Sequence, residues 1–185
     1  MTGVRIETER LVLRPMQPGD ATAVFDIFSI PEVTRYYEID ALVEFSQAVH
    51  LTEHFIANGR FAILMSGRMI GSCGLFAVHQ EYRSASLGYD LSSDFRGRGI
   101  MHEALVALLQ YGFSSLGLNR INALVYPENR ASIRVLEKLG FGMEGVMREF
   151  GFWKGQFHDM CLFALLARHW RASGLQDGSG KAIIA

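Results

Sequence analysis

The sequence of 185 residues lacks the features that mark several classes of protein. Its two cysteines, Cys73 and Cys161, are far apart and belong to no Cys-x-x-Cys pair, so neither a disulfide framework nor a zinc site is indicated. No stretch approaches the roughly 18 consecutive apolar residues that a membrane span requires. Charged residues interrupt positions 1–15, which argues against the apolar core of a signal peptide. We therefore expect a cytoplasmic protein with no membrane partner.

An excess of positive charge is also missing. The 18 lysines and arginines are offset by 19 acidic residues, which gives a formal net charge of −1. Nucleic-acid-binding domains usually carry a strong basic excess, so the balance argues against a nucleic-acid partner. Lysine occurs only as Lys138, Lys154 and Lys181, and the other cations are arginines, whose planar guanidinium suits phosphate recognition.

The hydrophobic pattern predicts one domain over residues 1–172, followed by a small, polar C-terminal tail over residues 173–185. Strand-like runs and helical periodicities alternate irregularly, in the order β-α-α-β-β-β-α-β-α-β-β. The predicted strands are 9–16, 61–65, 69–79, 85–91, 120–126, 141–150 and 157–166, and the predicted helices are 20–28, 41–57, 99–116 and 129–139. This order predicts a mixed α/β fold, with a central mixed sheet of about seven strands and helices on both faces.

The most informative segment is the loop 96–101, which joins a predicted strand to a predicted helix. Its residues are Arg96, Gly97, Arg98, Gly99, Ile100 and Met101. Glycines let the backbone turn without Cβ clashes, and the unpaired amides of a first helical turn attract anions. The two arginines can add phosphate contacts. The loop therefore predicts a pyrophosphate site.

The loop does not match either of two common nucleotide-binding motifs. A P-loop requires Gly-Lys-Ser/Thr, but Gly99 is followed by Ile100. A Rossmann turn requires a third glycine, and His102 stands at that position. A nucleotide-binding domain is therefore a weak alternative, which would predict affinity for ATP or NAD over CoA.

The loop resembles the acetyl-CoA loop of the GNAT N-acetyltransferase superfamily, which reads Arg/Gln-x-x-Gly-x-Gly/Ala. Arg96, Gly99 and Met101 occupy its three defined positions, and Met101 replaces the usual small residue. The segments ETERLVLRP, LGLNRINALVYPENRASIRVLEKLGFGMEGVMRE and GQFHDMCLFALL are typical of the RimJ/RimL branch, the ribosomal-protein-alanine acetyltransferases. The resemblance covers residues 7–168. It implies a GNAT-like, mostly antiparallel sheet and an acetyl-CoA-dependent N-acetyltransferase.

The resemblance also implies how the cofactor is held. The strand residues Tyr89, Asp90 and Leu91 would pair with the pantetheine arm as an added strand would. The loop 96–101 would bind the pyrophosphate through its amides. No metal ion is implied, and His50 and His54, four residues apart on a predicted helix, lack an HExxH pattern and an evident third ligand.

Asn129 and Ser132 match the Asn-x-x-Ser of the family at the start of the next helix. The resemblance implies that the asparagine contacts the cofactor and that the serine can return a proton to the leaving thiolate. From the residues alone, an ordinary N-cap is the favoured interpretation of Asn129, and the Ser132 hydroxyl could simply bond to the helix backbone.

In this family the amine attacks the thioester directly, and a base near the strand ends removes its proton. We predict Glu149 as that base, with Asp90 and Asp159 as alternatives, although each could instead form a salt bridge, for example with Arg148. Nothing marks a Cys-His pair, so Cys161 is not expected to act as a nucleophile.

The identity of the acceptor stays open. A protein N-terminal α-amine is favoured by the resemblance, and a small-molecule amine such as an antibiotic, polyamine or amino acid is the alternative. Aromatic residues around the turn at Lys154, and the segment 36–38, could wall an acceptor pocket or simply pack locally. A non-catalytic acyl-CoA-binding module on the same fold is a further alternative. A homodimer is implied by the resemblance alone.

Overall fold

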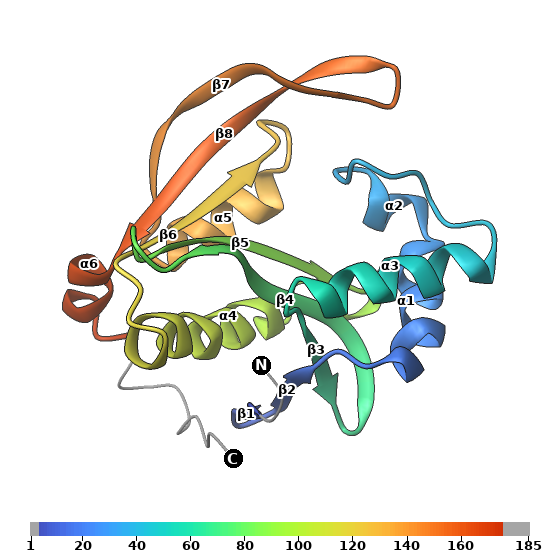
Figure 1. Ribbon diagram of the computed structural model, residues 1–185, viewed down its shortest axis with the longest axis horizontal. Coiled ribbons are helices and arrows are strands. Elements are labelled where there is room, and N and C mark those ends of the chain that lie inside the picture. Colours follow the sequence, from blue (N-terminus) through green and yellow to red (C-terminus); the bar gives the residue numbers. More distant parts are fainter. Residues whose placement is uncertain (1–3, 176–185) are drawn as a thin grey trace.

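Eight strands form one sheet in the computed structural model, which describes residues 4–175. They are β1 (Ile6–Glu7), β2 (Leu11–Pro15), β3 (Phe61–Met65), β4 (Arg68–His79), β5 (Ser84–Leu91), β6 (Arg120–Val125), β7 (Gly142–Trp153) and β8 (Gln156–Leu166). Their order is β1-β2-β3-β4-β5-β6-β8-β7 (Figure 1). Every neighbouring pair is antiparallel except β5 and β6, which run parallel. The predicted mixed, mostly antiparallel sheet is confirmed.

Helices cover both faces of this sheet. They are α1 (Ala21–Phe28), α2 (Pro31–Thr34), α3 (Phe45–Ala57), α4 (Ile100–Gln110), α5 (Arg130–Lys138) and α6 (Ala167–Ala172), with the short segments η1 (Pro18–Asp20), η2 (Ser93–Phe95) and the π-helical η3 (Tyr111–Ser115). Alternation along β3 separates two cores: Phe61 and Ile63 pack with α4 and α5, whereas Ala62 packs with α1 and α3. Within residues 4–175, no helix is long and apolar enough to cross a membrane.

The differences from the predicted elements have local causes. The helix predicted over 41–57 begins at Phe45, because the Gln47 side chain accepts a hydrogen bond from the Glu44 amide at 3.0 Å and caps it. The strand β1 and the helix α2 are too short to show a period, so they could not be predicted from the sequence. The eighth strand, β1, accounts for the difference from about seven. The predicted tail boundary at residue 173 stays a prediction, because residues 176–185 lie outside the described part.

The sheet divides between β5 and β6. These strands pair only at Ser84–Ser86, after which β5 continues with β4 while β6 continues with β8 as far as Val125. The Ser92 amide donates to Ile70 O at 2.9 Å, which makes Ile70 and Ser92 a hydrogen-bonded pair. Because such pairs alternate along antiparallel strands, the amide and carbonyl groups of Asp90 point toward β4, whereas those of Tyr89 and Leu91 point away from it. We call residues 87–91 the free edge of β5.

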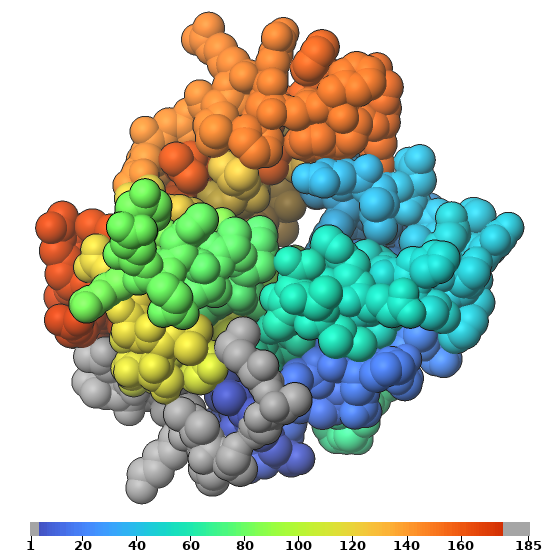
Figure 2. Space-filling model, in the orientation of Figure 1, coloured from blue at the N-terminus to red at the C-terminus, as the bar shows by residue number. Residues whose placement is uncertain are grey.

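The long hairpin of β7 and β8 extends beyond the rest of the sheet, and its tip faces α2 (Figure 1). Lys154 in its turn donates a hydrogen bond to Thr34 O at 2.9 Å. Two register shifts interrupt the hairpin, and Glu149 lies in the second of them with φ 47°. The surface is hollowed between the hairpin, drawn in orange, and the blue segment that carries α2 (Figure 2).

Candidate active site

The glycine loop follows directly from the free edge of β5. Gly97 and Gly99 have φ values of 74° and 73°, a left-handed conformation that favours glycine. Gly99 is the N-cap of α4, so the first amides of that eleven-residue helix have no partner within the helix. Arg96 and Arg98 are exposed beside them, and Arg96 Nε donates to Leu91 O at 3.4 Å. This arrangement of unpaired amides, glycines and arginines fits a pyrophosphate.

Ile100 and Met101 contribute to the loop through their backbone. Their side chains are buried in the core beneath α4, with exposed fractions of 1% and 8%. Met101, which departs from the small residue of the motif, therefore packs under the helix.

The residues that brace this loop were not predicted from the sequence. Arg10 donates from Nε to Glu103 Oε2 at 2.6 Å and from Nη1 to Arg98 O at 3.3 Å. Thr8 donates to Glu103 Oε1 at 2.5 Å. The turn between β1 and β2 thus holds the first turn of α4 in place. Thr8 and Arg10 belong to the ETERLVLRP segment, which was the available signal, but their partner is about 95 positions away.

Two hydroxyl groups meet across the division of the sheet. Ser132 Oγ lies 2.6 Å from Tyr89 Oη, which connects the first turn of α5 to β5. The Ser132 amide donates to Asn129 Oδ1 at 3.2 Å, so Asn129 is the N-cap that its residue type suggested. Burial raises the pKa of Tyr89 to about 12, so this phenol is protonated at neutral pH. The structure therefore brings together Tyr89, Asn129 and Ser132.

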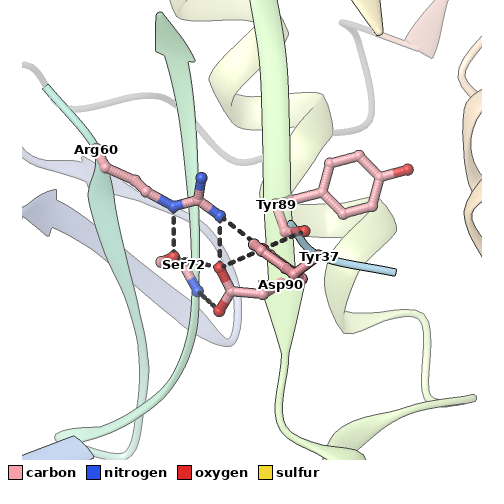
Figure 3. Close-up of polar contacts among 5 residues, drawn as sticks. All are labelled: Tyr37, Arg60, Ser72, Tyr89 and Asp90. Atoms are coloured by element: carbon pink, nitrogen blue, oxygen red, sulfur yellow. Dashed lines mark hydrogen bonds and ion pairs between the residues drawn. The ribbon is translucent and has the colours of Figure 1, made fainter. Parts of the chain in front are cut away.

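The Asp90 side chain lies on the opposite face of β5, inside a buried polar network (Figure 3). Its Oδ2 pairs with Arg60 Nη2 at 2.5 Å, and its Oδ1 accepts from the Ser72 amide at 3.0 Å. Arg60 Nε in turn donates to Ser72 Oγ at 2.6 Å. The side chains of Arg60 and Asp90 are 10% and 1% exposed.

Tyr37 joins this network from the segment after α2. Its Oη lies 3.2 Å from Asp90 Oδ2 and 3.4 Å from the carbonyl oxygen of Tyr89, and it accepts from Arg60 Nη2 at 3.3 Å. Burial, reinforced by the Asp90 carboxylate, raises the pKa of Tyr37 well above its usual range. The network therefore ties the segment that follows α2 to the free edge of β5.

These contacts correct two expectations for Asp90. Its backbone faces β4, so of the three strand residues only Tyr89 and Leu91 direct amide and carbonyl groups to the free edge. Its carboxylate is enclosed and engaged by Arg60 and Ser72, so it is a structural partner and not an available base. Close approach of the strands is also required, because a Cβ on Gly71 would lie 2.4 Å from Asp90 O.

The other two acidic residues lie together on the hairpin. Glu149 is exposed in β7, and its amide donates to Asp159 Oδ1 at 2.8 Å. The Asp159 carboxylate thus holds the bulged backbone at Glu149. Their position on the hairpin separates both residues from the network around Asp90.

An aromatic cluster lies between the hairpin and the segment that follows α2. The ring of Tyr126 lies 5.5 Å from Tyr36, 5.8 Å from Trp153 and 5.3 Å from His158, measured between centroids. Trp153 stacks on His158 at 4.8 Å. Three phenylalanines near the tip of the same hairpin are exposed instead, namely Phe150, Phe152 and Phe157.

Metal ligation has no support in the described residues. Residues 4–175 contain no group of three or more His, Cys, Asp or Glu side chains that could hold an ion. His54 Nε2 lies 3.3 Å from Asn58 Nδ2, and both His50 and His54 are exposed on α3.

The buried pair generates a stability prediction. Asp90→Asn keeps the shape of the side chain but leaves the Arg60 charge buried without its counter-ion, so we expect the free energy of unfolding to fall by about 3 kcal/mol. Urea unfolding measures this change. Glu144→Gln is the control, because its pairing with Arg120 is partly exposed and should contribute little. A loss no larger for Asp90→Asn than for Glu144→Gln would contradict the structural role of the pair.

Comparison with known proteins agrees with this geometry. Residues 10–142 match the family model of the acetyltransferase (GNAT) domain. An uncharacterized N-acetyltransferase, p20, of Bacillus licheniformis is 40% identical over 171 residues, which cover 88% of this chain and 96% of that protein. The spermidine N(1)-acetyltransferase of Escherichia coli K12 is 31% identical over 166 residues, 85% of this chain and 89% of that protein.

A solved structure extends the likeness to the fold. Mycobacterium smegmatis RimJ, in complex with CoA-disulfide, superposes with a TM-score of 0.77 at 25% identity, covering 94% of this chain and 96% of that one. The divided sheet, the glycine loop before α4 and the matched family model lead to one conclusion: the chain belongs to the GNAT family of acetyltransferases.

Proposed function

We propose that the protein transfers the acetyl group of acetyl-CoA directly to a primary amine, without a covalent enzyme intermediate. The observation that carries the proposal is the free edge of β5, which leads into the glycine loop at the N-terminus of α4. A strand edge without a partner strand, followed by unpaired helix amides, suits a ligand that combines amide groups with a pyrophosphate. Acetyl-CoA has both.

In this proposal the backbone of Tyr89 and Leu91 pairs with the pantetheine arm, and the amides of residues 97–101 hold the pyrophosphate. Arg96 and Arg98, both exposed at the loop, add charge-assisted contacts to phosphate. The Asn129 carbonyl group is occupied as the N-cap of α5, so its NH₂ group is the part that would contact the cofactor.

The chemistry follows from these positions. A protein α-amine has a pKa of about 7.7–8.0, so a sizeable minority is already neutral near pH 7 and a weak base suffices. We propose Glu149 as that base, because its carboxylate is exposed on the hairpin while that of Asp159 is engaged by the bulged backbone. The Leu91 amide at the free edge would hold the oxyanion, and Ser132 would return a proton to the leaving thiolate.

For the acceptor we propose a protein N-terminal α-amine. The sequence segments typical of the RimJ/RimL branch and the likeness to Mycobacterium smegmatis RimJ support this acceptor. The hollow between the hairpin and the segment after α2 is open at the surface, as a peptide end requires (Figure 2). A homodimer and a cytoplasmic location remain predictions from the sequence.

A polyamine is the second candidate, and a specific observation favours it. Burial raises the pKa of Tyr126, and the carboxylates of Glu38 and Glu128 raise it further, so two negative charges act on the aromatic cluster. Carboxylates beside aromatic rings attract ammonium groups. The similarity to a spermidine N(1)-acetyltransferase agrees with this acceptor.

The glycine loop provides a test of cofactor binding. Gly99→Val forces a β-branched residue into a left-handed conformation and distorts the amides before α4, so we expect acetyl-CoA affinity to fall at least tenfold, about 1.4 kcal/mol. Gly117→Val is the matched control, because Gly117 has φ 64°, has open space around it and lies near the other end of β5. Titration calorimetry measures the affinity. Equal affinity of the two variants would refute the loop assignment.

The base assignment is tested by pH. If Glu149 accepts the proton of the amine, Glu149→Gln removes the limb of the kcat/KM profile that reports this carboxylate, and the remaining rate rises with the fraction of neutral amine. The rate should fall about 100-fold at most, the lower range for a single acid or base. Asp159→Asn is measured beside it, and a change confined to that variant would move the role to Asp159.

The acceptor is identified by the release of free CoA, followed with a thiol-reactive dye over a panel of amines. The panel contains short peptides with free N-termini, polyamines, aminoglycosides and single amino acids. We expect release with the peptides, and release with polyamines alone would select the second candidate. Binding of acetyl-CoA with no release on any amine would favour a non-catalytic acyl-CoA-binding module.

A further inference from the structure

We propose that Tyr89 is a positioning residue, whose side chain donates its hydroxyl hydrogen to Ser132 Oγ and so directs the hydrogen of Ser132 toward the sulfur of the leaving thiolate. This inference rests on the proposed function, in which Ser132 acts at the sulfur. It assigns to the Tyr89 side chain a role separate from that of its backbone. The starting observation is the 2.6 Å contact between Tyr89 Oη and Ser132 Oγ.

The acidities of the two groups decide the direction of this hydrogen bond. A phenol has a pKa of about 10 and an alcohol is a much weaker acid, so the phenol is the better donor and the alcohol oxygen the better acceptor. The separation of 2.6 Å lies at the short end of the range for O–H···O bonds. Burial keeps the phenol protonated, because it raises the pKa of Tyr89 to about 12. Tyr89 therefore remains a donor throughout the neutral pH range.

Both partners are fixed before any ligand arrives. Ser132 is in the first turn of α5, where its amide donates to Asn129 Oδ1. Tyr89 is on β5, next to Asp90, which the Arg60 pair locks on the opposite face (Figure 3). The Tyr89 ring itself packs against the core that lies beneath α4 and α5. A hydrogen bond between two fixed groups restricts rotation of the Ser132 hydroxyl without a reorganisation cost during the reaction.

The backbone carbonyl group that would usually accept the Ser132 hydrogen already has another donor. A serine in a helix commonly donates to the carbonyl oxygen four residues earlier, which here belongs to Glu128. Tyr36 Oη already donates to Glu128 O at 3.3 Å. With Tyr89 occupying one lone pair of Oγ, the Ser132 hydrogen is available to the space between β5 and β6, where the proposed function places the thioester.

The experiment is a double-mutant cycle of Tyr89→Phe and Ser132→Ala, with kcat, KM and the dissociation constant of CoA measured for each protein. We expect Tyr89→Phe to lower kcat about fivefold to tenfold, the contribution of one hydrogen bond, while the calorimetric affinity for CoA stays unchanged. In the Ser132→Ala background, Tyr89→Phe should cause no further loss of kcat. Tyr82→Phe is the control for a lost tyrosine hydroxyl, because Tyr82 is 72% exposed in the turn between β4 and β5.

The outcomes distinguish a failure of this inference from a failure of the proposed function. An equal loss from Tyr89→Phe in both backgrounds, or a loss of CoA affinity that accounts for the whole effect, would show that Tyr89 acts through packing and overturn the inference. A low kcat for Ser132→Ala with an unchanged kcat for Tyr89→Phe would overturn it while leaving the serine role intact. An unchanged kcat for Ser132→Ala would remove the serine from the proposed reaction as well.

Discussion

Beyond Ser86, strand β5 keeps a partner strand on one edge only, and the surrounding structure is organised by that constraint. Backbone amide and carbonyl groups lose free energy when they are removed from water without a partner, so a free edge inside a sheet must be wetted or bound by a ligand. The edge persists because β6 is held by β8 and cannot follow β5. Residues at both ends of the strand then fix its position.

Alternation along β5 gives its two faces different chemistry. Asp90 faces a buried cluster in which an ion pair, a serine and a tyrosine satisfy one another. Burying an ion pair costs desolvation energy, which is recovered only with good geometry and additional hydrogen bonds, and both are present here. Tyr89 faces the side of α5, where its hydroxyl group meets that of Ser132. The buried ion pair thus lies on one face, and the contact between the Tyr89 and Ser132 hydroxyl groups lies on the other.

The sequence predicted the parts of the fold and site that depend on neighbouring residues. The left-handed glycines of the loop, the Asn129 cap and the mixed sheet follow from short-range rules, and the structure has all three. The sequence could not predict that the Asp90 backbone faces away from the free edge of β5. That orientation depends on the register with β4, and a shift of one residue would reverse it.

Contacts between residues far apart in the chain could not be predicted from the sequence either. Arg60 meets Asp90 across 30 positions and Arg10 meets Glu103 across 93, and no local pattern specifies such partners. The bulge at Glu149 was missed for a related reason, since a register shift is defined only against a partner strand.

That bulge has a consequence for behaviour at high concentration. The twelve-residue strand β7 is the last in its sheet and exposes Met143, Val146, Met147, Phe150 and Phe152, a composition that invites edge-to-edge aggregation. The left-handed backbone at Glu149 interrupts the ladder near its middle, so a foreign strand could pair with β7 only over short segments. The irregularity that carries the Glu149 carboxylate would thus also protect an apolar outer strand from polymerisation.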